Sequence, residues 1–183
     1  MEMKLYTLLV YSENIAGILN QITAVFTRRQ VNIESLNVSA SSIEGIHKYT
    51  ITAWSDPDQI EKITKQIEKK IDVVKAKYYT DDQLFIREAG LYKLSTQVVL
   101  ENPEISRIIR RYEAWITEVN PTYVAVMKSG MTKHIVSLYE ELNAFGCVLQ
   151  YTRSGRIAIT RSTEEEVSAF LEEREKNIEN GKG

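Results

Sequence analysis

Residues 12–19, Ser-Glu-Asn-Ile-Ala-Gly-Ile-Leu, form the segment whose residue types best suit the binding of a small ligand. An alternating apolar segment precedes them and an amphipathic segment follows, which predicts a polar turn between a strand and a helix. Backbone N–H groups and the positive end of a helix dipole both favour an anion at such a turn. Because Gly17 has no Cβ, a carboxylate or phosphate can approach the backbone there. We call residues 12–19 the elbow.

The groups in and near the elbow suit a zwitterion better than a phosphate. Backbone N–H donors at Ala16, Gly17 and Ile18 suit a carboxylate. The side-chain oxygens of Asn14 and Asn32 can accept hydrogen bonds from an ammonium group, and Ile18 and nearby apolar residues can receive a short aliphatic side chain. The elbow contains no lysine or arginine, which disfavours a phosphate. These residues therefore indicate a free amino acid as the ligand.

The same residues also have a purely structural explanation, which the sequence leaves open. In this explanation, Ser12 or Asn14 is an N-cap of the helix and has no further role. Gly17 then only relieves crowding in the first helical turn, and Asn32 only occupies a turn conformation that asparagine tolerates.

The other reactive side chains do not form a recognisable catalytic or metal site. His47 and His134 fall in different halves of the chain, and neither has a cysteine or carboxylate at metal-ligand spacing. Cys147 is next to apolar residues and is expected to be a buried small side chain. No phosphate-binding glycine motif is present. The sequence thus predicts no enzymatic activity, no catalytic residue and no metal site.

Composition limits the class of protein and its surroundings. The chain has 183 residues, of which 43% are hydrophobic and 26% are charged, as in ordinary globular proteins of one or two domains. A net charge of −2 gives no general reason to bind nucleic acid, and no apolar run is long enough to span a membrane. The N-terminus lacks the pattern of a signal peptide, and the single cysteine favours a reducing compartment. We expect a cytoplasmic protein with no membrane or nucleic-acid partner.

The elements that position the elbow follow the order βαββαβ. The expected strands are residues 5–11, 33–41, 46–54 and 71–79, with one helix at 18–29 and another that begins at Asp56-Pro57. Ile18, Leu19, Ile22, Val25 and Phe26 form the expected apolar stripe of the first helix.

A second cycle of strands and helices follows a polar break at residues 80–83. Its expected strands are 91–100, 115–119, 123–127, 148–151 and 156–160, and its helices begin near Asn102-Pro103, Met131 and Thr163. The last two strands are expected to pair with each other around Ser154-Gly155. The predicted fold is α+β, with two ferredoxin-like βαββαβ domains in tandem. They cover residues 1–80 and 84–175, and a frayed tail covers residues 176–183.

Several motifs resemble the small, regulatory subunit of acetolactate synthase, also called acetohydroxyacid synthase. The elbow has the family's EN-x-x-G-x-L pattern, and residues 32–36 read NIESL, a combination specific to this family among ACT domains. Residues 66–74 continue the match. Beyond residue 80 it rests on Arg87-Glu88 and on residues 151–155, where serine replaces the family's threonine.

This resemblance implies that residues 1–80 form an ACT domain, an amino-acid sensor that pairs into homodimers. It implies regulation without an active site: the family's small subunit activates the thiamine-diphosphate-dependent catalytic subunit and confers feedback inhibition by valine or another branched-chain amino acid. Thiamine diphosphate, Mg and FAD are expected on the catalytic subunit, and no cofactor on this chain. The effector contacts carried over are Asn14, Gly17 and Ile18 from one protomer, and Asn32 from its dimer partner.

Two alternatives remain open at this point. A free-standing ACT-type sensor could control another enzyme or a transcription factor. RNA-binding RRM domains share the βαββαβ order, but residues 46–54 lack the aromatic signature of their third strand.

Overall fold

The computed structural model describes residues 2–163, 167, 171 and 172. Contacts divide the chain into two compact units. The first unit runs to Phe85 and also includes the described residues from Ala158 onward, whereas the second is Ile86–Ile157. This division differs from the expected second domain, 84–175, at its C-terminal end. Residues beyond 157 join the first unit because Val167 is buried against Ile46 and Val74.

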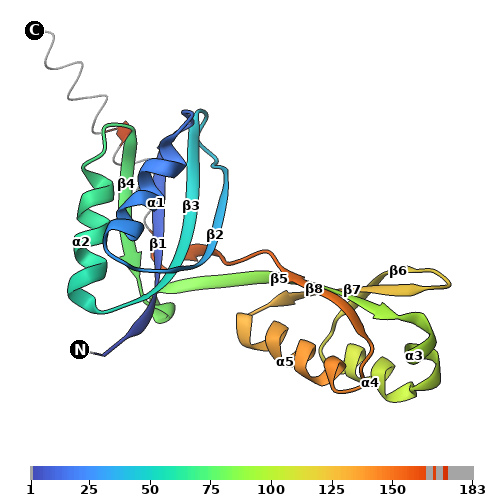
Figure 1. Cartoon of the computed structure of the whole chain (residues 1–183). Helices are drawn as coiled ribbons and strands as arrows, with labels where there is room; N and C mark the ends of the chain where they lie inside the picture. Colours follow the sequence, from blue (N-terminus) through green and yellow to red (C-terminus); the bar gives the residue numbers. More distant parts are fainter. Residues whose placement is uncertain (1, 164–166, 168–170, 173–183) are drawn as a thin grey trace, which may run out of the picture. The chain divides into compact units, whose positions relative to one another are not determined.

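The first unit is a four-stranded antiparallel sheet with two helices on one face (Figure 1). The strand order is β2-β3-β1-β4, so β2 and β4 are the edge strands. Its elements are β1 (Lys4–Glu13), α1 (Ile18–Arg28), β2 (Ile33–Ala40), β3 (Ile46–Ser55), α2 (Pro57–Glu68) and β4 (Val73–Tyr79). The predicted βαββαβ order is therefore confirmed.

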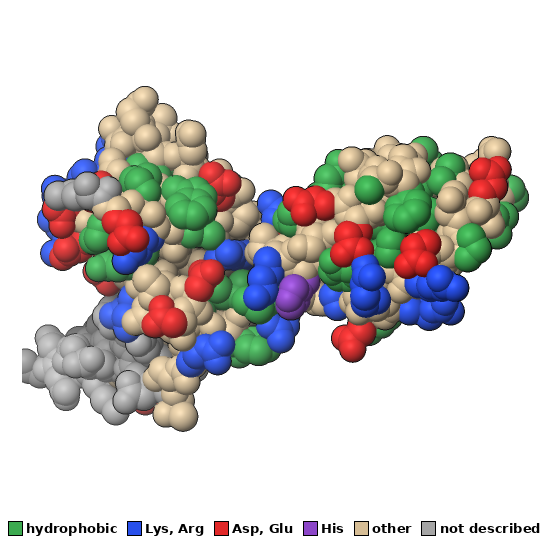
Figure 2. All heavy atoms as spheres, turned by 90° about the horizontal axis from the view of Figure 1, so that it is seen from below, with side chains coloured by type: hydrophobic (Ala, Val, Ile, Leu, Met, Phe, Trp, Pro, Cys, Tyr) green, Lys and Arg blue, Asp and Glu red, His purple; other side chains and the backbone are tan. Residues whose placement is uncertain are grey.

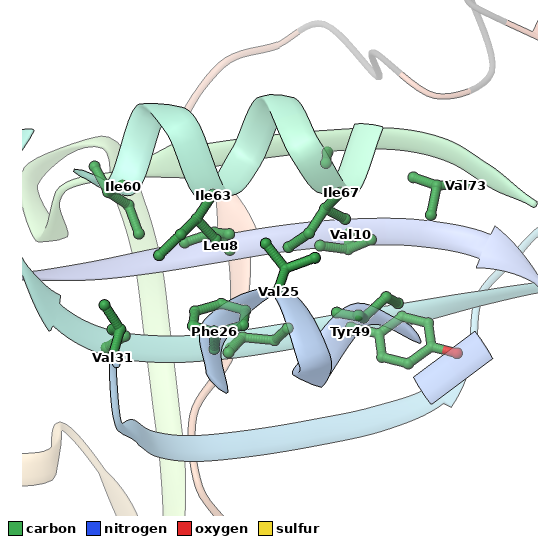
Figure 3. Packing of buried hydrophobic residues seen from close by; sticks show 14 of the residues in the cluster. Leu8, Val10, Val25, Phe26, Val31, Tyr49, Ile60, Ile63, Ile67 and Val73 are labelled. Carbon is green, nitrogen blue, oxygen red and sulfur yellow. The ribbon is translucent and has the colours of Figure 1, made fainter. Parts of the chain in front are cut away.

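The core of this unit lies between the sheet and the two helices (Figure 3). Alternate residues of the central strands point toward the helices, since side chains alternate between the faces of a strand. The fully buried side chains include Leu8, Phe26, Ile51, Ile60, Ile63 and Ile67. The predicted start of α2 is also confirmed: Asp56 is the N-cap, and its Oδ1 accepts a hydrogen bond from the N–H of Gln59 at 2.9 Å.

The second unit repeats this topology with the strand order β6-β7-β5-β8. The prediction of an α+β fold with two βαββαβ-like units is thus confirmed. After the short 3-10 helix η1 (Asp81–Gln83), the elements are β5 (Leu84–Ser95), α3 (Thr96–Glu101), α4 (Pro103–Arg111), β6 (Trp115–Val119), β7 (Tyr123–Gly130), α5 (Thr132–Asn143), β8 (Val148–Arg153) and β9 (Ile157–Thr160).

The prediction of a strand over residues 91–100 is wrong in its second half. The apolar run Val98-Val99-Leu100 has high β propensity, but the chain becomes helical at Thr96. The Thr96 hydroxyl donates to the carbonyl oxygen of Asn120 at 2.8 Å and fixes the end of β5. Val98 and Val99 then pack against the core of the second unit from a helix.

The expected pairing of residues 148–151 with 156–160 is also wrong. β9 pairs with β5 instead, and β8 pairs with β5 between Gly90 and Leu94. The sequence prediction began β5 at Leu91, but the strand begins at Leu84 and is 12 residues long. The last predicted helix, from Thr163, falls mostly outside the described residues.

Candidate ligand site at the elbow

The backbone of the elbow bends at Gly17, which is the N-cap of α1. Gly17 has φ +90° and ψ −12°, in the left-handed region that favours glycine. No side chain caps this helix, so the expectation that Ser12 or Asn14 caps it is wrong. A Cβ built on Gly17 would meet no atom within 4 Å, so glycine is required by the positive φ and not by crowding.

Hydrogen bonds inside the elbow leave two backbone donors available. The N–H of Asn14 donates to Gly45 O at 3.0 Å, and the N–H of Ile15 donates to Glu13 O at 3.0 Å. The N–H of Ile18 donates to Ile15 O at 3.3 Å, so it is not the free donor that the sequence predicted. Among the described residues, none accepts a hydrogen bond from the N–H of Ala16 or Gly17. These two groups can receive an anionic ligand.

Ile18, which the sequence indicated as a contact for the ligand, is not exposed at the surface of the elbow. Ile18 is only 4% exposed and belongs to the core of the first unit, so its side chain cannot receive a ligand. Ile15 is 43% exposed and Leu19 is 41% exposed, which corrects the placement of Leu19 on the buried stripe. Leu19 was assigned to the buried stripe because the predicted stripe took in every aliphatic position in the first turn of the helix, whereas Ile15 precedes the helix and was not part of that stripe.

Asn14 and Asn32 are not brought together within one chain. Asn14 precedes the N-terminus of α1, and Asn32 follows its C-terminus. The 11 residues of α1 separate these ends by about 16 Å. Asn32 is exposed and lies beside a shallow pocket of about 270 Å³, which is lined by Thr23, Phe26, Thr27, Gln30, Val31, Asn32 and Ile33. A site that uses both asparagines therefore needs a second copy of the chain.

The structure also shows the surroundings of the other side chains that could bind a metal or act as a nucleophile. No group of three His, Cys, Asp or Glu residues that could hold a metal ion occurs among the described residues. Cys147 is fully buried, its Sγ donates to Leu142 O at 3.1 Å, and burial raises the pKa of the thiol. Within the described part of the chain, no helix has both the length and the apolar character needed to cross a membrane.

The face shown in Figure 2 carries mixed charges on the second unit, where basic and acidic side chains lie next to one another. Two ion pairs belong to its helices. Arg107 Nη1 lies 3.0 Å from Glu104 Oε2, and Arg111 pairs with Glu141. Paired charges of this kind give no continuous basic surface for nucleic acid on this face.

Known proteins match both units of the chain. A model for the AHAS small subunit-like ACT domain matches residues 8–75, and a model for the small subunit of acetolactate synthase matches residues 87–162. The acetolactate synthase small subunit of Bacillus subtilis is 31% identical over 157 residues, which cover 85% of this chain and 90% of that protein. The probable acetolactate synthase small subunit of Methanothermobacter thermautotrophicus is 32% identical over 151 residues, 82% of this chain and 89% of that protein.

A solved structure shows the same fold. The acetolactate synthase small subunit from Thermotoga maritima aligns with a TM-score of 0.79 at 23% identity, over 88% of this chain and 99% of that chain. The elbow lies inside the ACT-domain match, which favours an amino-acid sensor over the RNA-binding alternative. The chain belongs to the acetolactate synthase small subunit family, a non-catalytic regulatory family, and its first unit is an ACT domain.

Proposed function

We propose that this chain binds the catalytic subunit of acetolactate synthase, raises its activity, and inhibits it when valine or another branched-chain amino acid binds at the elbow. Assembly with a catalytic subunit is supported by membership of the small-subunit family and by an alignment that covers 90% of the Bacillus subtilis small subunit. The effector site is supported by one observation above all. Gly17 is the N-cap of α1 and no side chain caps the helix, so the N–H groups of Ala16 and Gly17 have no hydrogen-bond acceptor among the described residues.

Homodimerisation through β2 is part of this proposal. β2 is an edge strand of the first sheet, and an unpaired edge is a template for pairing with another chain. A twofold axis beside β2 would join two four-stranded sheets through identical surfaces. Asn32 directly precedes β2, so this pairing would bring Asn32 of the partner subunit toward the elbow of the first.

In the resulting site each part of the amino acid has a matching group. The carboxylate accepts hydrogen bonds from Ala16 and Gly17, and the ammonium donates to Asn14 and to Asn32 of the partner subunit. Charge-assisted hydrogen bonds of this kind contribute about 1.5–3 kcal/mol each. The exposed side chains of Ile15 and Leu19 contact the branched aliphatic chain, in place of the buried Ile18.

Calorimetric titration of the full chain with valine, leucine and isoleucine tests this site. Asn14→Ala is expected to weaken binding of the preferred amino acid at least about tenfold. Asn143→Ala removes an exposed asparagine at the end of α5 and serves as the matched control with unchanged affinity. Equal affinity in the wild type and Asn14→Ala would disprove the assignment. Co-purification with a thiamine-diphosphate enzyme separates this function from that of a free-standing sensor.

A further inference from the structure

The turn that carries Asn32 is held by a residue of α2. Asn32 lies between the C-terminal end of α1 and the start of β2. The side-chain amide of Gln59, in the first turn of α2, donates to the carbonyl oxygen of Arg29 at 3.0 Å. Arg29 is the C-cap of α1, and the last carbonyl groups of a helix have no partner within the helix. Gln59 therefore supplies a hydrogen bond that the end of α1 lacks.

The backbone of this turn is strained at Gln30. Gln30 has φ +54°, a conformation that glycine adopts readily and glutamine adopts rarely. Its side-chain amide donates to Thr27 O at 3.1 Å, and the N–H of the buried Val31 donates to Phe26 O at 3.1 Å. A residue keeps a strained conformation only where the surrounding contacts hold it. The contacts around Gln30 therefore define the path of the chain just before Asn32.

Gln59 is itself fixed from the other side. The Ser55 hydroxyl donates to Gln59 Oε1 at 3.4 Å, and the N–H of Gln59 donates to the capping carboxylate of Asp56 at 2.9 Å. Because Oε1 accepts from Ser55, the amide nitrogen of the same side chain is the group that faces Arg29. Gln59 thus connects the end of β3 and the N-terminus of α2 to the C-terminus of α1.

We propose that Gln59 is a positioning residue for the amino-acid effector, because it fixes the turn that presents Asn32 to the partner subunit. This inference rests on the proposed effector site, in which Asn32 accepts a hydrogen bond from the ammonium group. Asn32 is exposed, and its side chain forms no hydrogen bond with any described residue, so its direction depends on the backbone that carries it. A hydrogen bond weakens steeply when its distance or angle changes, so a displaced turn lowers the affinity for the effector.

Gln66, on the same helix, provides a matched control. It contacts the same residue as Gln59, but its Oε1 accepts a hydrogen bond, from Arg29 Nε at 3.1 Å. Replacing glutamine by glutamate exchanges the amide nitrogen for an oxygen and hardly changes the shape of the side chain. Gln59→Glu therefore removes the donor to Arg29 O, whereas Gln66→Glu keeps the acceptor for Arg29 Nε.

The experiment is calorimetric titration of the full chain with valine, leucine and isoleucine, under conditions in which urea unfolding shows every variant to be folded. Gln59→Glu is expected to weaken binding of the preferred amino acid at least about fivefold. Gln66→Glu is expected to change this affinity less than about twofold. In an Asn32→Ala background, adding Gln59→Glu should weaken binding less than about twofold, because a residue that acts through Asn32 has no effect without it. A purely structural role would lower stability and leave the affinity of the folded chain unchanged.

Three results would overturn the positioning role alone, provided that Asn32→Ala weakens binding: unchanged affinity in Gln59→Glu, an equal loss in Gln66→Glu, or the full loss from Gln59→Glu in the Asn32→Ala background. If Asn32→Ala binds all three amino acids like the wild type, the effector site fails and the positioning role fails with it. The two failures are therefore distinguishable.

Discussion

The N–H of Asn14 donates to the carbonyl oxygen of Gly45 at 3.0 Å, which connects the elbow to the turn between β2 and β3. Gly45 has φ +76°, in the left-handed region that favours glycine. An amino acid that binds at the elbow can therefore affect the position of β2, the edge strand proposed to form the dimer. A ligand regulates through such a connection only if it favours one arrangement over another.

Gly17→Ala is expected to lower stability and to abolish the response to the amino acid. Alanine has open space at this position but must adopt φ +90°, which costs about 1–2 kcal/mol. Urea unfolding and valine calorimetry measure the two effects. Gly146→Ala is the matched control, because Gly146 also has positive φ and open space around its Cβ position. If Gly146→Ala lost valine binding to the same extent, the elbow would have no special role.

Val38→Lys is expected to prevent dimerisation. Val38 is 38% exposed on β2, and a lysine on an edge strand discourages pairing. Valine binding should be lost with the dimer, since the proposed site takes Asn32 from the partner subunit. Val119→Lys on β6, the corresponding edge strand of the second unit, serves as the control. Sedimentation equilibrium should show a monomer for Val38→Lys and a dimer for Val119→Lys, and the reverse pattern would move the interface to the second unit.

Arg153→Leu is expected to destabilise the second unit by about 2–3 kcal/mol. The Glu88 side chain is only 2% exposed, and its Oε1 lies 3.6 Å from Arg153 Nη1. Removing the partner of a buried charge costs about 3–5 kcal/mol, and the figure is reduced here because Arg153 is 37% exposed. Arg107→Leu removes an exposed ion pair and should change the free energy of unfolding by less than about 1 kcal/mol. Similar losses in both variants would contradict this account of Glu88.

Tyr92→Phe is expected to change how stability depends on alkaline pH. Burial raises the pKa of Tyr92 above its ordinary value of 10.0. The folded state thus retains a proton that the unfolded state loses, so this contribution is complete below pH 10 and decreases as the pH rises above it. The phenol also donates to Ile135 O at 2.7 Å, and its loss should cost about 1 kcal/mol at pH 8.

Urea unfolding at pH 8 and at pH 10.5 measures both effects of Tyr92→Phe. The variant should be less stable than the wild type at pH 8 and should lose less stability between the two pH values. Identical losses in the two proteins would show that Tyr92 does not titrate differently on folding. Tyr151, whose pKa burial also raises, remains in both proteins and cancels in the comparison.

Local patterns predicted much of the fold. Proline after a capping residue located the starts of α2 and α4, and alternating apolar residues located β1 and β3. The pairing of β9 with β5 depends on contacts between distant parts of the sequence, which local periodicity does not encode. The elbow itself was recognisable from Gly17, but the burial of Ile18 and exposure of Leu19 depend on how α1 is rotated against the sheet.

The most direct test is valine inhibition of the catalytic subunit reconstituted with wild-type chain or with Asn14→Ala. We predict that both chains raise the activity of the catalytic subunit and that valine inhibits only the complex with the wild-type chain. Equal inhibition of the two complexes by valine would contradict the central claim that the elbow is the effector site.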